Sequence, residues 1–262
     1  DFKWTTNFIY SHAKNKVTDL KTAKRVIDLV AGNGFAQEGY PVRSLFSIPF
    51  QGLNNEGIPT FTDQDGNVTT TGIYFQEQNN LDFLEYSGSI DPTDTGSFGN
   101  IFKIKNFTLN AFITYSLGNV VRLDPIFSNT YDDLDSTPRE FNNRWAVPGD
   151  EEKTNIPVIA SVNQNKVDTN LNYAYNAYNY STERVAKGDF IRMKEISLGY
   201  EFPKNITNSL RVNKLSLKLQ ATNLFLLYSD SKLNGQDPEF FNTGGVALPM
   251  AKQFTMTLRI GL

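Results

Sequence analysis

The last eleven residues of the chain, 252–262, alternate between apolar and polar positions without interruption. After Lys252, every second residue from Phe254 to Leu262 is apolar, and the residues between them are polar or small. Successive side chains of a β-strand point to opposite faces, so the pattern predicts a strand with one apolar and one polar face. About ten residues are also what a tilted strand needs to cross a bilayer. An exposed strand of a soluble β-sandwich has the same period, so the pattern alone leaves both environments open.

Five further segments carry the same period of two and are predicted to be strands. They cover residues 2–10, 98–104, 107–117, 190–202 and 215–225. A shorter candidate, 45–50, contains Pro49, which has no N–H and is confined to edge strands or loops. The window 17–30 has apolar residues at helical spacing, but its β-branched residues and the lack of a clear cap make a helix the less favoured interpretation.

The connections between these strands differ greatly in length. Lys105-Asn106 forms a tight turn and 203–214 a moderate one, whereas 11–97, 118–189 and 226–251 are long. Short turns at one end and long loops at the other are typical of outer-membrane barrels, whose long loops lie outside the cell. Soluble domains rarely contain three structureless connections of this length. The pattern therefore predicts an all-β fold, an antiparallel transmembrane β-barrel with long extracellular loops and short periplasmic turns.

Composition narrows the possible functions. The 262 residues include no cysteine and one histidine, His12, which argues against thiol catalysis, disulfides, cysteine-bound metal and histidine-based triads. The net charge of −3 gives no basic footprint for nucleic acid. Aromatic residues make up 13% of a chain whose mean hydropathy is −0.39, a balance typical of exposed β-structure. No apolar run reaches the length of about 18 residues that predicts a transmembrane helix.

Four polar features resemble chemical sites, and each has a simpler explanation. Residues 63–67 resemble the start of a calcium loop, but Tyr74 occupies the position of the final glutamate and Asp-Gly predicts a turn. Residues 132–135 are better explained as a solvated acidic loop than as a cation site. Neither His12 nor the pair Glu151/Glu152 has partners that converge in the sequence. We therefore expect no metal site, no cofactor and no enzymatic activity.

Aromatic residues in the long connections are the candidate ligand contacts. Flat aromatic faces beside Asn, Asp and Arg suit the capture of sugars or peptides. The candidates are Tyr86, Tyr131, Trp145, Tyr178, Phe240 and Phe241. The alternative is that these side chains pack the loops against each other or against a covering protein. The tyrosine-rich run 172–180 also suits a strand whose tyrosines lie in an interfacial girdle.

Several short motifs occur in a characteristic order along the chain. They are Gly-Leu-Asn at 52–54, Glu-Gly-Ile-Pro at 56–59, Tyr-Ser-Gly at 86–88, Asn-Arg-Trp at 143–145, Pro-Gly-Asp at 148–150, Gly-Asp-Phe-Ile-Arg-Met-Lys-Glu opening 188–203, Ala-Thr-Asn-Leu-Phe at 221–225 and Asp-Pro-Glu at 237–239. In this order and spacing, the chain resembles SusC/RagA-type TonB-linked outer-membrane proteins. The resemblance extends over essentially the whole chain.

The resemblance implies that residues 1–262 are the C-terminal segment of a barrel of the 22-stranded type. The family's N-terminal domain, TonB box and plug have no counterpart here, and the chain opens directly into a strand pattern without a signal peptide. Six strands cannot close a barrel, since the smallest barrels use eight. We therefore expect the remaining strands to come from another chain or from a longer polypeptide.

The family also implies a function in the bacterial outer membrane. Such a protein imports oligosaccharides or peptides with a SusD-like surface lipoprotein and a plug driven by TonB, and it performs no covalent chemistry. One alternative is a SusC-like scaffold in a secretion or assembly complex, because a fold does not determine a function. A second alternative is a secreted β-sandwich that binds glycans. The sequence does not name the substrate.

Overall fold

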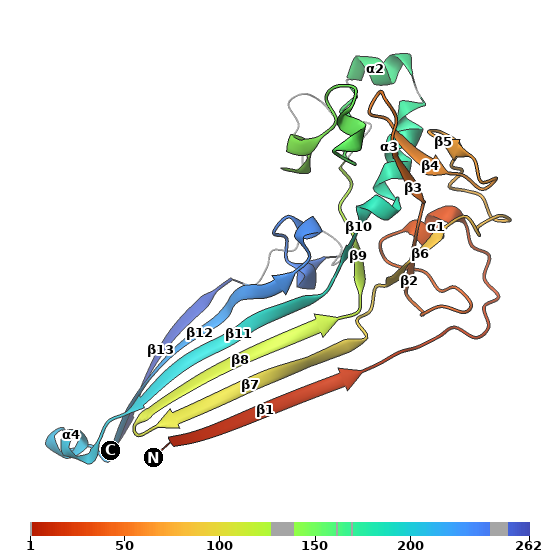
Figure 1. Ribbon diagram of the computed structural model, residues 1–262. Coiled ribbons are helices and arrows are strands. Elements are labelled where there is room, and N and C mark those ends of the chain that lie inside the picture. Colours follow the sequence, from red (N-terminus) through yellow and green to blue (C-terminus); the bar gives the residue numbers. More distant parts are fainter. Residues whose placement is uncertain (1, 127–138, 161, 169, 242–250) are drawn as a thin grey trace.

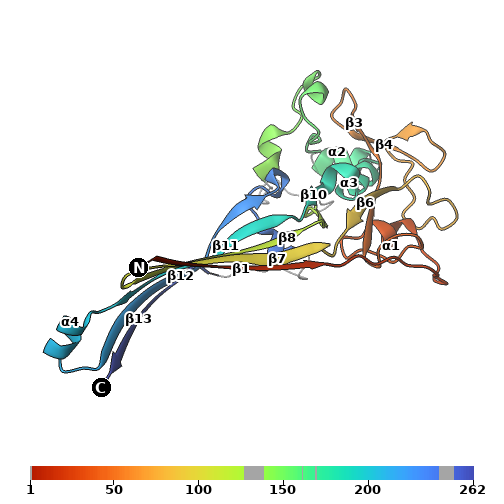
Figure 2. The ribbon, with the colours of Figure 1, turned by 60° about the horizontal axis from the view of Figure 1, so that its bottom comes forward.

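The computed structural model describes residues 2–126, 139–160, 162–168, 170–241 and 251–262. A long curved sheet carries, at one end, a lobe of loops, short helices and small sheets (Figure 1). We call this part the loop lobe, meaning the described residues of 13–93, 118–189 and 230–241. Both ends of the chain lie at the opposite, turn end of the sheet (Figure 2). The two regions are therefore separated along the long axis of the molecule.

Six antiparallel strands form the large sheet in the order β1-β7-β8-β11-β12-β13. Their bounds are β1 Phe2–His12, β7 Asp94–Ile104, β8 Phe107–Leu117, β11 Phe190–Glu201, β12 Lys214–Ser229 and β13 Gln253–Gly261. All six predicted strands are confirmed, and β1, β7 and β12 extend beyond their predicted limits. Because β1 and β7 are neighbours, the connection 13–93 is a single excursion that leaves and re-enters the sheet at the same end.

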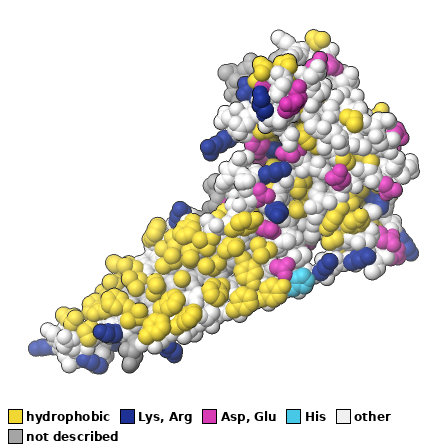
Figure 3. Space-filling view, in the orientation of Figure 1, with side chains coloured by type: hydrophobic (Ala, Val, Ile, Leu, Met, Phe, Trp, Pro, Cys, Tyr) yellow, Lys and Arg dark blue, Asp and Glu magenta, His cyan; other side chains and the backbone are white. Residues whose placement is uncertain are grey.

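Cross-strand partners form continuous rows across the sheet, and the rows alternate between its faces. One apolar row consists of Trp4, Phe102, Leu109, Leu198, Leu219 and Met256. The next row, on the opposite face, consists of Thr5, Ile101, Asn110, Ser197, Gln220 and Thr255. Trp4 is 61% exposed and Met256 is 72% exposed, so the apolar face is uncovered. Figure 3 shows this face as a nearly continuous hydrophobic belt over the strands.

The register is irregular near the loop end of β11 and β12, where it shifts between Ile191 and Arg192 and again between Met193 and Glu195. At the second shift, Lys194 is the extra residue relative to β8. On β12, Asn223 has a φ of 53° in the left-handed region, which asparagine tolerates better than most residues. The asparagine of the motif 221–225 therefore has a conformational role in the sheet.

The turn end is short and tightly bonded. Lys105 and Asn106 connect β7 to β8, and Lys105 takes a φ of 52°. The longer connection contains α4 (Lys204–Ser209), which begins directly after Pro203. Proline suits this position because its missing N–H has no partner to lose at a helix start. Both predicted turns are thus confirmed.

The loop lobe has its own secondary structure. From residues 13–93 come α1 (Val26–Val30), β2 (Ser44–Ser47), β3 (Phe50–Leu53), β4 (Pro59–Thr62), β5 (Val68–Thr69) and β6 (Glu85–Ser89). From 118–189 come β9 (Val120–Arg122), η1 (Arg139–Asn143), η2 (Asp150–Glu152), α2 (Val162–Val167), α3 (Leu171–Asn179), η3 (Thr182–Arg184) and β10 (Val185–Lys187). The last loop contributes η4 (Ser231–Leu233) and η5 (Pro238–Phe240).

Two local predictions need correction, and a third agrees with the structure. Only the end of the window 17–30 is helical, as α1, which the sequence analysis disfavoured. The tyrosine-rich run 172–180 is the helix α3 rather than a girdle strand, because its aromatic side chains at helical spacing pack into the lobe. The candidate 45–50 is divided between β2 and β3 around Pro49, which agrees with the expected effect of proline.

The long loops fold around a common hydrophobic core. Its buried members come from both large excursions and include Val26, Ile48, Phe61, Phe141 and Tyr178. Phe50 contacts both Phe61 and Tyr178, with ring centroids 6.2 and 5.6 Å apart. The long connections are therefore not structureless, because they bury enough apolar surface to fold on each other. Among the described residues, the helices are all too short or too polar to cross a membrane.

Candidate functional site

A buried arginine joins the two large excursions of the loop lobe. Arg122, in β9, is 7% exposed. Its guanidinium donates to the backbone oxygens of Ser181 and Phe46, both at 2.7 Å, and of Val30 at 3.2 Å. Burial lowers the pKa of Arg122 to about 9, which leaves the group charged at neutral pH. A charged donor strengthens these bonds, so Arg122 holds the excursions in one arrangement.

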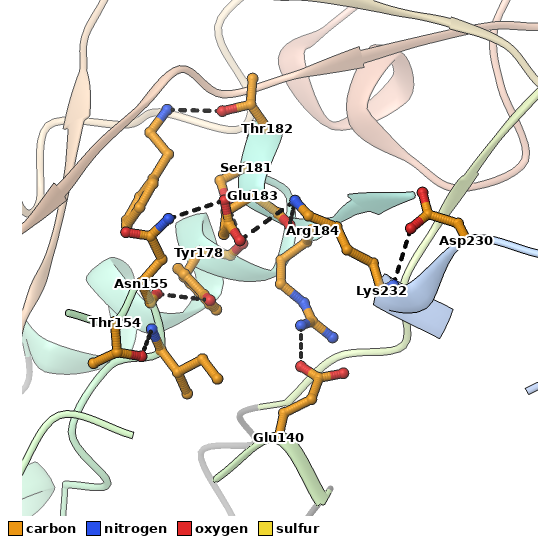
Figure 4. A network of polar contacts seen from close by, with 12 residues as sticks. Glu140, Thr154, Asn155, Tyr178, Ser181, Thr182, Glu183, Arg184, Asp230 and Lys232 are labelled. Carbon is orange, nitrogen blue, oxygen red and sulfur yellow. Dashed lines mark hydrogen bonds and ion pairs between the residues drawn. The ribbon is translucent and has the colours of Figure 1, made fainter. Parts of the chain in front are cut away.

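A second buried arginine extends the network to the last loop (Figure 4). Arg184, in η3, is ion-paired with Glu140. Glu140 also accepts a hydrogen bond from the side chain of Asn234, at 3.0 Å. Lys232, in η4, pairs with Glu183 at 3.4 Å. All three long loops are therefore connected by charged groups at the base of the lobe.

Two of the motifs found in the sequence pack directly on each other. Gly57 lies against the Trp145 ring, so that a Cβ on Gly57 would approach the ring to 2.5 Å. The Trp145 indole donates to Glu151 Oε2 at 2.8 Å, and the same oxygen accepts the Gly149 N–H at 2.8 Å. These bonds hold the pKa of the Glu151 carboxyl below its usual value. The motifs at 56–59, 143–145 and 148–150 thus form one structural unit.

Another pair of motifs meets where the lobe joins the sheet. Arg192, on the polar face of β11, forms an ion pair with Asp237 and another with Glu239, at 3.2 Å for the latter. Its guanidinium carbon also lies 5.5 Å from the centre of the Phe190 ring. Arg192 is only 6% exposed, so the pairing anchors the last loop firmly to the sheet.

Two glycines of the motifs allow close approach in the same region. Gly188 donates its N–H to the Asn119 carbonyl at 2.9 Å, and a Cβ there would meet the Asn119 side chain at 2.2 Å. Gly88, with a φ of 144°, lies against Val120. These contacts bring β6, β9 and the start of β11 together and define the floor of the lobe.

The structure separates the predicted ligand-contact aromatics into two groups. Trp145 is 8% exposed and Tyr178 is 1% exposed, and the Tyr178 hydroxyl donates to the Asn155 carbonyl at 2.9 Å. Both belong to the internal packing of the lobe, which is the alternative that the sequence left open. Tyr131 lies outside the described residues, as does the acidic segment 132–135.

The remaining three predicted residues are accessible. Tyr86 is 41% exposed and packs against Tyr40 with the rings tilted and their centroids 4.8 Å apart. Phe240 and Phe241 are half-buried beside η5. Phe241 also packs against a small cluster that contains Val121. Their role in binding a ligand stays a prediction.

Phe241 lines a cleft between the lobe and the sheet, with a volume of about 360 Å³. We call it the junction cleft. Its other walls include Arg43, Asp91, Ser116, Phe190 and Glu239. Arg43 and Asp91 form an ion pair at 2.6 Å. The sequence did not predict these two charged residues, because they are 48 positions apart within one excursion and carry no local pattern.

A second cavity, of about 520 Å³, lies at the tip of the lobe. Its lining is mainly apolar and includes Ile58, Val158, Val167, Leu171 and Tyr175. The Tyr175 hydroxyl donates to the Val158 carbonyl at 2.6 Å. This cavity is far from the sheet and has fewer charged groups than the junction cleft.

The polar candidates of the sequence have structural explanations. Asp63 Oδ1 accepts the backbone N–H groups of Asp65 and Asn67, so this segment is a turn between β4 and β5. His12 Nδ1 lies 2.9 Å from Asp94 at the loop end of β1. Within the described ranges, no three His, Asp or Glu residues form a group that could hold a metal ion.

Comparison with known proteins places this geometry in context. The TonB-dependent receptor P39 of Formosa agariphila is 24% identical over 95% of this chain and 26% of its own length. The TonB-dependent receptor P3 of the same organism is 24% identical over 91% of this chain and 23% of its own length. The chain thus spans about a quarter of these relatives. No family model matches it.

Solved structures agree with these relatives. A chain in the structure of the RagAB peptide transporter superposes with a TM-score of 0.71 and 21% identity, covering 99% of this chain and 27% of the other. The RagAB peptide importer in its closed-closed state gives a TM-score of 0.71 and 20% identity over the same shares. The predicted resemblance is thereby confirmed: over nearly its whole length, this chain is similar to TonB-dependent receptors, and it has the fold of about a quarter of a RagAB chain.

Proposed function

We propose that this chain forms part of the barrel wall and the external loops of a TonB-dependent importer in the bacterial outer membrane. The observation that carries this proposal is the two-faced sheet. Its apolar rows are exposed across all six strands, and its polar rows lie on the opposite face. A strand that separates lipid from a polar lumen has this organisation.

The dimensions of the belt support the same conclusion. Aromatic residues lie in the apolar-face rows at both ends, with Tyr10, Tyr115 and Tyr228 near the loop end and Phe107 and Tyr200 near the turn end. Tyr10 and Phe2, in the first and last of these rows, are eight residues apart, which is about 27 Å along a strand. An outer-membrane barrel has an apolar band about 25 Å tall between two aromatic girdles.

We propose the transported substrate and the partners by analogy with the similar proteins. RagAB is a peptide transporter, and we propose that the complete receptor takes up peptides or oligosaccharides. A SusD-like lipoprotein would cover the loop lobe, and TonB would act on parts of the receptor outside residues 1–262. The chain itself performs no covalent chemistry, and binding by the loops and passage through the lumen are its contributions.

Two alternatives are weaker. A secreted glycan-binding β-sandwich would bury one face of each sheet against the other. Here Trp4, Phe254 and Met256 are 61%, 77% and 72% exposed, which does not suit a sandwich in water. A scaffold in a secretion or assembly complex would share the same barrel wall, so only transport distinguishes it from an importer.

The test uses the full-length receptor in its own outer membrane. Cells with and without the gene are given fluorescent peptides of four to six residues or labelled oligosaccharides, and uptake into the periplasm is measured before and after a protonophore is added. We expect uptake that requires both the gene and the proton gradient, together with copurification of one surface lipoprotein. A gene deletion that leaves all uptake intact but abolishes secretion of another protein would support the scaffold instead.

A further inference from the structure

The junction cleft lies on the lumen side of the proposed barrel wall. Ser116 and Phe190 are direct cross-strand partners, and both line the cleft. They belong to the polar-face set of rows, since the adjacent pair, Tyr115 and Ile191, belongs to the apolar face. A ligand that passes from the loop lobe into the lumen therefore meets this cleft, whereas membrane lipid does not.

Charges of both signs line the cleft and are partly accessible. The Arg43 and Asp91 side chains are 47% and 43% exposed, and each uses one terminal atom in their ion pair at 2.6 Å. The Glu239 side chain is 39% exposed, although its partner Arg192 is 8% exposed. Because the Arg43–Asp91 pair is exposed and contributes little stability, its two groups can share or exchange partners with a charged ligand at small cost.

Aromatic surface lies beside these charges. Phe190 is held under the Arg192 guanidinium, and Phe241 packs on the cluster that contains Val121, so both rings have fixed positions. A cleft of about 360 Å³ is within the range of roughly 300–1,000 Å³ that is typical of ligand pockets. Rigid apolar walls between a cation and two carboxylates are complementary to a ligand with a positive group, a negative group and small side chains.

We propose that the junction cleft binds the charged termini of short, unblocked peptides. The Arg43 guanidinium receives the terminal carboxylate, and Asp91 and Glu239 receive the terminal ammonium group. This inference rests on the proposed import function and narrows it, because a neutral oligosaccharide would leave these charges without a charged partner. Loss of a charged hydrogen bond costs about ten- to a hundredfold in affinity.

The experiment measures binding to the detergent-solubilised full-length receptor with its copurified lipoprotein. Calorimetry compares tetraalanine with tetraalanine amide, N-acetyl-tetraalanine amide and maltotetraose. We expect tetraalanine to bind at least tenfold more tightly than the amide, and the doubly blocked peptide to bind more weakly still. Arg43→Gln should abolish the difference between tetraalanine and its amide, and Arg43→Lys should restore most of it.

Arg25→Gln is the matched control, because Arg25 is another accessible arginine of the lobe that pairs with a carboxylate, Asp28, at 2.9 Å, and it does not line the cleft. This variant should bind all probes as the unchanged receptor does. Equal affinity for blocked and unblocked peptides, or preferred binding of maltotetraose, would overturn the inference while peptide or sugar uptake by cells still supports import. If no probe binds and cells show no uptake, the proposed import function is itself wrong.

Discussion

The large sheet and the loop lobe use the same apolar residue types in opposite ways. In the sheet, Phe254 is 77% exposed and Phe8 is 65% exposed. In the lobe, Phe61 and Ile48 are fully buried, and Tyr178 is 1% exposed. The lobe therefore has the organisation of a fold in water, with its hydrophobic side chains inside. The sheet has the organisation of a fold in hydrocarbon, with its apolar side chains outside. One chain contains both kinds of structure, and they meet at the loop end of the sheet, near the row that contains Ser116 and Phe190.

The two regions also differ in how their contacts are arranged along the sequence. The sheet pairs each strand with its neighbours by a regular main-chain register, and β8 follows β7 after a two-residue turn. The lobe depends on side chains far apart in sequence, such as Arg122, which bonds to Val30 across 92 residues. A single core substitution should therefore damage the lobe and leave the sheet intact.

Tyr178→Ala should have the largest effect on the lobe. The change removes a large buried ring and the hydroxyl that bonds to Asn155, and truncation of a buried aromatic residue typically costs about 3–5 kcal/mol. We expect amide hydrogen exchange to accelerate throughout the lobe in the full-length receptor, while exchange in β8 and β11 stays slow. Tyr173→Ala, on the exposed face of the same helix, is the control, and a similar acceleration there would contradict the interpretation of α3 as a core helix.

Leu219→Arg should have the next largest effect, and it acts on the sheet. Leu219 lies in the central apolar row, so the charge would enter the hydrocarbon at a cost of about 2–4 kcal/mol near the membrane midplane. Denaturant unfolding of the full-length receptor in phospholipid vesicles measures this cost. Gln220→Arg, one residue away on the polar face, should change the free energy of unfolding far less. Equal costs at the two positions would mean that the apolar face is not the lipid face.

The difference between the regions explains how much the sequence could predict. Alternation is a local property, so the strands and the turn at Lys105 could be predicted from the residues alone. The lobe could not, because whether Tyr178 faces a ligand or a core depends on partners such as Phe50, more than a hundred residues away. The motifs carry the resemblance to TonB-dependent receptors, but the sequence does not show why these residues occur together. In the structure, Trp145 packs on Gly57 and Arg192 forms an ion pair with Asp237.

Gly57→Ala should test the packing of two motifs in the lobe. Gly57 has a φ of 76° and touches the Trp145 ring, so the substitution adds backbone strain and an overpacking cost of about 1–3 kcal/mol. Gly66→Ala supplies the control, because Gly66 has a φ of 82° and no neighbouring atom within 4 Å of an added Cβ. The difference between the two variants in the local stability of the lobe, measured by hydrogen exchange, isolates the contact with Trp145. If both variants lose the same stability, that contact contributes nothing.

The smallest expected effect is a pH-dependent shift of the Trp145 indole resonance in the lobe, compared with that of Trp4 in the sheet. Hydrogen bonds from the Trp145 indole and from backbone N–H groups hold the folded-state pKa of Glu151 below its ordinary value of 4.5. A depressed carboxyl pKa contributes stability that is present above pH 4.5 and is lost as the pH falls through the folded-state value. The indole ¹⁵N–¹H resonance of Trp145, assigned with Trp145→Phe, should therefore shift as the solution is acidified below that pH. The Trp4 indole bonds to the neutral side chain of Asn100 at 2.9 Å and should not shift. Glu151→Gln should remove the titration at Trp145, and if it persists in that variant, another acidic group is responsible.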